Sequence, residues 1–228
     1  MKNSSNNIIY DAQSVNFREI RMGNIAPNIL YRSSHPIINN KQEKAISLLA
    51  AKTNILTVIN LSDTMSAIAR KAFYAPWYNK LLGSGRVLAL CMDFNYTNPV
   101  FKRKLKEALQ FMIHTEGPYL IHCHAGIDRT GFVCMVIESF MGASLNDVIN
   151  DYLMSFNSIF ESSILTTQKA DEITAMQLLS VMSSSQKINE ENLQLIAEIY
   201  LRKNIKMSAE EIELLRRRLS GMNNLIGK

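Results

Sequence analysis

Features that mark several common protein classes are scarce or missing in this 228-residue sequence. Its only cysteines are Cys91, Cys123 and Cys134, without a C-x-x-C pair, which argues against a disulfide framework and favours a reducing compartment. No apolar run reaches membrane-spanning length, and residues 1–13 lack the apolar core of a signal peptide. We therefore expect a soluble cytoplasmic protein without stable membrane insertion, with non-classical export as a secreted effector as the alternative.

The sequence also lacks a strong charge of either sign. Its formal charge of +5 and pI near 9.1 indicate only a mild attraction to anions such as phosphorylated substrates, nucleic acid or acidic membranes. No nucleic-acid recognition motif accompanies the charge, so we expect no nucleic-acid partner. At 47% hydrophobic and 20% charged residues, the composition is that of a globular protein, which excludes disorder of the whole chain.

What is present is an alternation of strand and helix patterns. Apolar, β-branched runs predict four strands, at 28–34, 55–63, 86–94 and 118–123. Amphipathic segments predict helices between them, two of which are at 39–54 and 100–114. This order predicts an α/β fold with one domain and a central, largely parallel sheet flanked by helices. We divide the chain into an N-terminal arm (1–26), a catalytic core (27–160) and a helical extension packed on the core (161–228).

The segment "HCHAGIDRTG" (122–131) follows the fourth strand and leads into a helix predicted to end near Gly142. Backbone N–H groups at such a helix start form an anion cradle, and Arg129 adds a bidentate fork for phosphate oxygens. The same field stabilises a thiolate, so Cys123 is a candidate nucleophile. Thr130 is placed to donate a hydrogen bond to the sulfur.

Other interpretations of this segment are less consistent with it. Core packing suits Cys91 and Cys134, but for Cys123 it leaves the Gly and Arg residues unexplained. His122 and His124 flank Cys123 but have no second cluster of ligands with them, which disfavours a metal site. The Lys of a nucleotide P-loop is absent, and a sulfur-transfer loop of the rhodanese type does not need Arg-Thr-Gly.

"HCHAGIDRTG" matches the HCxxGxxR[ST]G signature of the cysteine-dependent protein tyrosine phosphatase superfamily. "LYRSSHP", "ILTVINLSD" and "DYLMSFN" also resemble segments of its compact bacterial, dual-specificity-like members, so the resemblance runs from about residue 24 to 160. It implies metal-independent hydrolysis of phosphotyrosine, with possible dual specificity, through a phosphocysteine intermediate and with no cofactor. By this resemblance Cys123 is the nucleophile and Thr130 the neighbouring hydroxyl, His122 supports the loop, and the phosphate is bound by residues His124, Ala125, Gly126, Ile127, Asp128 and Arg129.

Two aspartates compete for the role of general acid. Asp93 lies at a strand end where the superfamily usually carries its acid, and Asp128 lies inside the loop; Asp63 is a weaker candidate. We favour Asp93, with Asp128 as loop organiser or auxiliary acid/base. Asp128 resembles the CxxGKDRTG subgroup, which includes phosphoinositide phosphatases, but Ile127 replaces its Lys and so removes attraction for additional phosphates.

The substrate and its recognition stay open at this point. A phosphorylated protein is the first expectation; a phosphoinositide or inositol phosphate is the alternative, and a phosphate-binding module without turnover is a third. Residues 70–80 combine cations and aromatics that either flank an aryl phosphate, press on a membrane or simply pack on the sheet. Arg32 and His35, at the end of the first predicted strand, either face the same edge or have an ordinary hydrogen-bonded role. The oligomeric state is not predicted.

Overall fold

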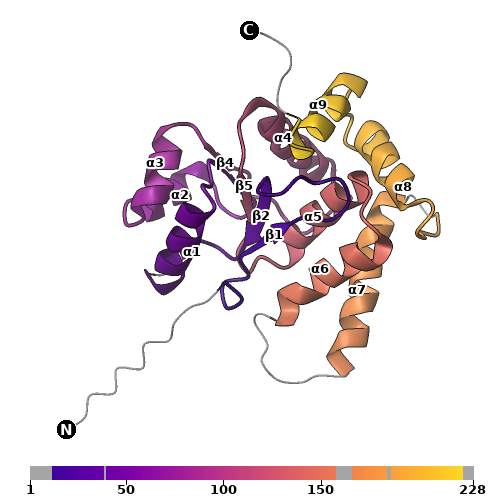
Figure 1. The fold of residues 1–228 in the computed structure, drawn as a ribbon, viewed down its shortest axis with the longest axis horizontal. Helices are drawn as coiled ribbons and strands as arrows, with labels where there is room; N and C mark the ends of the chain where they lie inside the picture. The colour runs from indigo at the N-terminus through magenta and orange to yellow at the C-terminus, as the bar shows by residue number, and fades with distance from the viewer. Residues whose placement is uncertain (1–11, 39, 158–165, 184–185, 223–228) are drawn as a thin grey trace.

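The computed structural model describes residues 12–38, 40–157, 166–183 and 186–222. Its centre is a five-stranded sheet in the order β1-β2-β5-β3-β4 (Figure 1). The strands are β1 (Arg18–Ile20), β2 (Leu30–Ser33), β3 (Thr57–Asn60), β4 (Val87–Ala89) and β5 (Tyr119–His122). β2, β5, β3 and β4 pair in parallel, which confirms the predicted α/β fold with a largely parallel sheet.

β1 is a strand that the sequence analysis did not predict. It pairs antiparallel with β2, with Arg18 opposite Arg32 and Ile20 opposite Leu30. Part of the predicted N-terminal arm therefore belongs to the sheet, and Val15, Phe17 and Ile20 are buried. The division into arm, core and extension otherwise stays a prediction, because residues 1–11 and 158–165 lie outside the described residues.

Helices cover both faces of the sheet (Figure 1). On one face lie α1 (Asn40–Lys52), α2 (Met65–Ala72) and α3 (Pro76–Gly83), and on the other α4 (Pro99–His114), α5 (Asp128–Phe140) and the C-terminal helices. Successive residues of a strand point to opposite faces, so Leu120 of β5 packs with the α1–α3 layer while Tyr119 and Ile121 pack with the α4–α5 layer.

The C-terminal part is helical, as predicted. Its elements are α6 (Leu145–Asn157), α7 (Thr166–Ser183), α8 (Leu193–Ile199), a π-helical turn (Tyr200–Asn204) and α9 (Ala209–Leu219). Ser144 accepts a hydrogen bond from the Asp147 amide at 3.0 Å, and Ser208 forms a capping box with Glu211. Within the described ranges no helix has the length and apolar character needed to cross a membrane.

Candidate active site

The signature loop lies at the carboxyl end of β5, between two neighbouring parallel strands. β5 ends at His122, the loop runs through residues 123–127, and α5 begins at Asp128. The Cys123 side chain is 2% exposed, and the Gly131 amide donates to the Ile127 carbonyl at 2.6 Å to start the helix. The predicted strand–loop–helix arrangement is therefore present, at the sheet edge where ligands bind in α/β folds.

Two carbonyl groups of the loop are held by donors from other segments. The His124 carbonyl accepts the His35 amide at 2.9 Å, and the Gly126 carbonyl accepts Arg32 Nη2 at 2.8 Å and Asn16 Nδ2 at 3.1 Å. In the described structure no acceptor takes the amides of residues 124–127. With its carbonyls engaged and its amides unpaired, the loop presents the donors that an anion cradle requires.

Gly126 is required at its position for two reasons. Its φ is +77°, a region that side chains rarely adopt, and a Cβ there would lie 2.5 Å from the Ser33 carbonyl oxygen. Because Ser33 is in β2, the collision would be with rigid backbone. The glycine thus lets the loop pass closely over the second strand.

Arg32 has the hydrogen-bonded role of its two candidate roles and does not face the substrate edge. Its side chain is fully buried and forms an ion pair with Asp151 of α6. Arg18 of β1 donates from Nε to the same carboxylate at 2.7 Å, and both arginines donate to Ser155 Oγ at 2.9 Å. We call Arg18, Arg32, Asp151 and Ser155 the loop-anchoring network, because it links β1 and α6 to the Gly126 carbonyl.

Two further ionisable residues, Glu138 and Cys134, lie near the loop-anchoring network. Burial and the charge of Asp151 raise the pKa of Glu138 well above its usual range, which favours the neutral form of this carboxyl. Burial raises the pKa of Cys134 to about 12, and this thiol is fully buried as predicted. Burial would also raise the pKa of Asp151, but Arg32 and Arg18 outweigh it and the pKa is lowered.

Arg129, the predicted phosphate clamp, joins the loop to the segment that carries Asp93. Its Nη1 donates to the Met92 carbonyl at 2.9 Å, and its guanidinium lies 4.4 Å from the centre of the Phe94 ring. The Arg129 side chain is largely buried, whereas Phe94 is 57% exposed. The structure therefore brings residues 92–94 and the loop together at one edge.

The two candidate acids have different surroundings. Asp93 is exposed, and its carboxylate accepts the Asn95 amide at 3.0 Å; the following helix, α4, is capped by Asn98 instead. Asp128 is half-buried at the start of α5. It lies close enough to Tyr96 to raise the pKa of that hydroxyl together with burial, which is the larger cause.

Thr130 is fully buried, and within the described residues its hydroxyl has no hydrogen-bond partner. It precedes Gly131, where an added Cβ would meet the Tyr152 ring at 2.6 Å. The first turn of α5 is thus packed closely against α6. The predicted role of Thr130 beside the sulfur stays a prediction.

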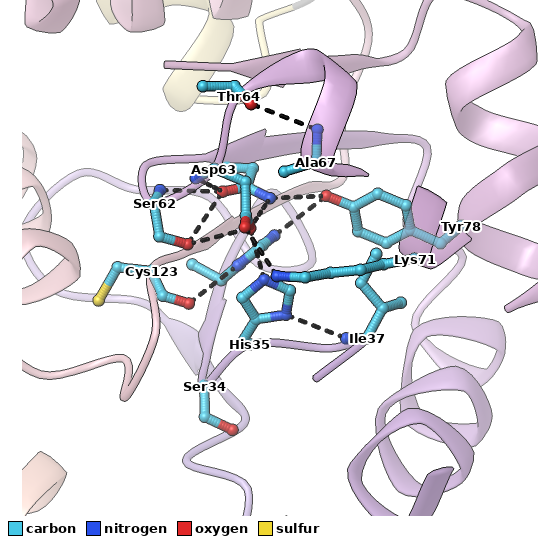
Figure 2. Close-up of polar contacts among 12 residues, drawn as sticks. Ser34, His35, Ile37, Ser62, Asp63, Thr64, Ala67, Lys71, Tyr78 and Cys123 are labelled. Carbon is cyan, nitrogen blue, oxygen red and sulfur yellow. Dashed lines mark hydrogen bonds and ion pairs between the residues drawn. The ribbon is translucent and has the colours of Figure 1, made fainter. Parts of the chain in front are cut away.

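His122 lies beneath the loop in a hydrogen-bonded chain. Its Nδ1 is 3.1 Å from the Cys123 carbonyl, which can only accept, and its Nε2 is 3.2 Å from the Tyr78 hydroxyl. Nδ1 therefore carries the proton and Nε2 accepts from Tyr78, while Asn60 Nδ2 donates to the Tyr78 oxygen at 3.3 Å. Figure 2 shows the Cys123 carbonyl within this chain and its sulfur directed away from it.

Burial, with a further contribution from His35, lowers the pKa of His122 well below its usual range, so the imidazole is neutral. It is fixed by neutral hydrogen bonds and places no positive charge under the nucleophile. His124, the second histidine of the segment, is exposed. Among the described residues no group of three His, Cys, Asp or Glu side chains is arranged to hold a metal ion.

Asp63 is excluded as general acid by its partners. His35 Nε2 lies 2.5 Å and Lys71 Nζ 2.8 Å from its carboxylate oxygens, and Asn60 Nδ2 lies at 3.0 Å (Figure 2). Burial would raise its pKa, but these hydrogen bonds outweigh it and hold the pKa far below its usual range. His35, the other residue with these two candidate roles, is itself buried and committed to Asp63 and to the Ile37 amide.

One expectation about the flanking segments needs correction. Cys91 was expected in the core but is exposed, because β4 ends at Ala89 and the chain turns at Cys91 with a φ of +44°. Residues 70–80 pack on the core through Ala72, Ala75 and Tyr78, whereas Phe73 and Tyr74 are exposed. All three cysteines are free thiols, as predicted.

Comparison with known proteins identifies the class of this site. A family model described as "Tyrosine phosphatase family" matches residues 12–221. The chain belongs to the tyrosine phosphatase family. The phosphatase is thus a cysteine-based phosphomonoester hydrolase, as its signature loop predicted.

A search of curated protein sequences gives no significant match to the phosphatase. Similar solved structures include the core catalytic domain of the PP-IP phosphatase SIW14 from S. cerevisiae in complex with citrate. That structure is 20% identical with a TM-score of 0.46, and the match covers 87% of this chain and 98% of that one. A second, the Siw14 catalytic core, is 17% identical with a TM-score of 0.42, covering 82% and 96%.

Proposed function

We propose that the phosphatase hydrolyses phosphotyrosine through a phosphocysteine intermediate. The observation that carries this proposal is the loop itself: a buried Cys123 at the end of β5, unpaired amides around it, and Arg129 held beside it by the Met92 carbonyl. These are a nucleophile and a set of donors for the phosphoryl oxygens in one place. Such a set of donors is suited to binding the dianion of a phosphate monoester.

In the first step the Cys123 thiolate attacks phosphorus, and the bond from phosphorus to the leaving oxygen breaks. The loop amides of residues 124–129 and the Arg129 guanidinium bind the three phosphoryl oxygens. Asp93 gives its proton to the leaving oxygen. In the second step water attacks phosphorus, Asp93 takes its proton, and the sulfur leaves as a thiolate assisted by the Thr130 hydroxyl.

We assign the general acid to Asp93 because its carboxyl is exposed between Met92 and Phe94, the two residues that contact Arg129. Asp128 starts α5, where a carboxylate is favoured by the helix dipole and helps to organise the loop. The neutral, hydrogen-bonded His122 fixes the Cys123 carbonyl and with it the direction of the thiol.

The aromatic substrate is favoured by Phe94, which is 57% exposed beside the Arg129 guanidinium. A phenyl ester bound at Arg129 has this ring to stack against. Ile127, where the resembling subgroup carries Lys, is buried and offers no cation for a second phosphate. Both features favour an aryl monophosphate over a polyphosphorylated inositide.

A substrate panel tests this proposal. Phosphate release from phosphotyrosine, phosphoserine and phosphothreonine peptides and from phosphoinositides is measured for the wild type and for Cys123→Ser. We expect the highest kcat/KM on phosphotyrosine peptides and no turnover by Cys123→Ser. Preference for phosphoinositides would refute the substrate, and a wild type without turnover on any ester would make the protein a binding module.

The assignment of the acid is tested by pH–rate profiles of Asp93→Asn, with Asp128→Asn as the matched control. The same carboxyl-to-amide change is made in both variants. We expect Asp93→Asn to lower kcat on phosphotyrosine by about 10²–10⁴ and to remove the alkaline decline of kcat/KM. If Asp128→Asn shows these effects and Asp93→Asn keeps the wild-type profile, the two roles are reversed.

A further inference from the structure

The turn between α2 and α3 exposes two aromatic side chains. Phe73 is 75% and Tyr74 76% exposed, and their rings pack edge to face with centroids 5.2 Å apart. The two helices bury other residues, namely Ile68, Ala72 and Tyr78. The aromatic pair therefore does not contribute to the core, although leaving two such rings in water is unfavourable.

Positive charge is concentrated in the same part of the molecule. We call residues 40–86, which comprise α1, the buried strand β3, α2, α3 and their connections, the basic layer. It has two acidic residues, Glu43 and Asp63, against seven basic ones: Lys41, Lys44, Lys52, Arg70, Lys71, Lys80 and Arg86. Residues 87–228 have 14 Lys and Arg against 16 Asp and Glu.

The basic layer therefore carries a net charge of +5, as large as that of the whole chain. One of its two acids, Asp63, is mostly buried, forms an ion pair with Lys71 and is hydrogen-bonded to His35. Arg70 is exposed and lies in the last turn of α2, directly before the turn that carries the aromatic pair. Lys80, on the next helix, is also exposed. The layer forms one side of the molecule, opposite the C-terminal helices (Figure 1).

We propose that the basic layer docks on an anionic lipid bilayer, with Phe73 and Tyr74 entering the headgroup region. Aromatic rings are favoured at this depth, and basic residues beside them are attracted to anionic headgroups. The aromatic pair lies on the exposed turn between two helices, where both rings are accessible to a continuous surface such as a bilayer. This proposal goes beyond hydrolysis of the ester, since docking needs no turnover.

Co-sedimentation with vesicles tests the docking. The vesicles are neutral phosphatidylcholine, or phosphatidylcholine with about 30% phosphatidylserine, at low and high salt. We expect the wild type to bind only the anionic vesicles, and less at high salt. Phe73→Ser/Tyr74→Ser should weaken binding at least about tenfold. Arg70→Gln/Lys80→Gln should weaken it about fivefold for each cation lost.

The matched control is Ile173→Ser/Leu195→Ser, which removes two exposed apolar side chains, 54% and 62% exposed, from α7 and α8 on the other side of the sheet. Its binding should equal that of the wild type, and thermal unfolding checks that every variant is folded. Docking is refuted if the wild type does not bind anionic vesicles at low salt, or if the control loses as much as the aromatic variant.

A dependence on Arg70 and Lys80 without one on the aromatic pair would indicate an acidic macromolecule as the partner and would also overturn the proposal. Turnover of a soluble aryl phosphate is measured in parallel. A wild type that binds vesicles but shows no turnover would refute the proposed hydrolysis and leave the docking intact, so the two failures are distinguishable.

Discussion

Replacing Asp151 with Asn tests the loop-anchoring network. The Asp151 carboxylate is the anion for two buried or largely buried arginines, Arg18 and Arg32, and the change leaves both without a counter-charge. Removing one partner of a buried ion pair costs about 3–5 kcal/mol. For a chain of this size, each kcal/mol lowers the melting temperature by about 2–4 °C, so we expect a drop of about 6–20 °C.

The same variant should also weaken phosphate binding. Arg32 donates to both Asp151 and the Gly126 carbonyl, so its displacement loosens the loop in variant molecules that are still folded. We expect the inhibition constant of vanadate, an oxyanion that binds in place of phosphate, to rise about tenfold at a temperature well below the melting transition. Urea unfolding gives the stability, and vanadate inhibition gives the state of the loop.

Glu138→Gln is the matched control, because it makes the same carboxyl-to-amide change beside the same network. The raised pKa of Glu138 favours its neutral carboxyl, which an amide resembles in charge, so this change should cost less than about 1 kcal/mol. A loss below about 1 kcal/mol in Asp151→Asn, or an equal loss in both variants, would refute the assignment of the stabilising charge to Asp151.

Three other outcomes are expected. The folded-state pKa of Glu138 is raised, so its contribution to stability is present below the ordinary Glu pKa and is lost as pH rises through the raised value. Glu138→Gln should therefore flatten the decline of the urea midpoint with rising pH, and an unchanged slope would contradict this. Gly126→Ala should abolish phosphatase activity and vanadate binding, because its Cβ collides with the Ser33 carbonyl; full activity would show that the loop does not need this close approach. Phe94→Ala should raise KM about tenfold for aryl phosphates and leave it unchanged for alkyl phosphates, and equal effects on both would remove the stacking role.

The local features of the fold were predictable from the sequence because their causes are local. Continuous apolar runs identified β2, β3, β4 and β5, and the signature loop was recognised from its own ten residues. The fold class follows from the alternation of these strands with helices. The family model then matches nearly the whole chain, well beyond the segments that suggested the resemblance.

What could not be predicted depends on partners distant in the sequence. β1 is three residues long and includes Arg18 and Glu19, so it has no apolar run, and it is held by pairing with β2 and by Asp151, 133 residues after Arg18. The sequence left Arg32 open between the substrate edge and a hydrogen-bonded role, because an arginine is seldom buried without a counter-ion and its counter-ion, Asp151, is on α6. Cys91 was misplaced because β4 ends two residues before it.

The anchoring of the Gly126 carbonyl has a consequence for how the protein is made. Its donors are Asn16 and Arg32, and the acid that holds Arg32 is Asp151, so the loop is complete only when segments from both halves of the chain have met. During synthesis the signature loop leaves the ribosome before α6 does. Contacts so distant in sequence form slowly and late in folding. A nascent or partly folded chain therefore carries Cys123 without an ordered cradle, and we expect phosphatase activity to appear only when the fold is complete.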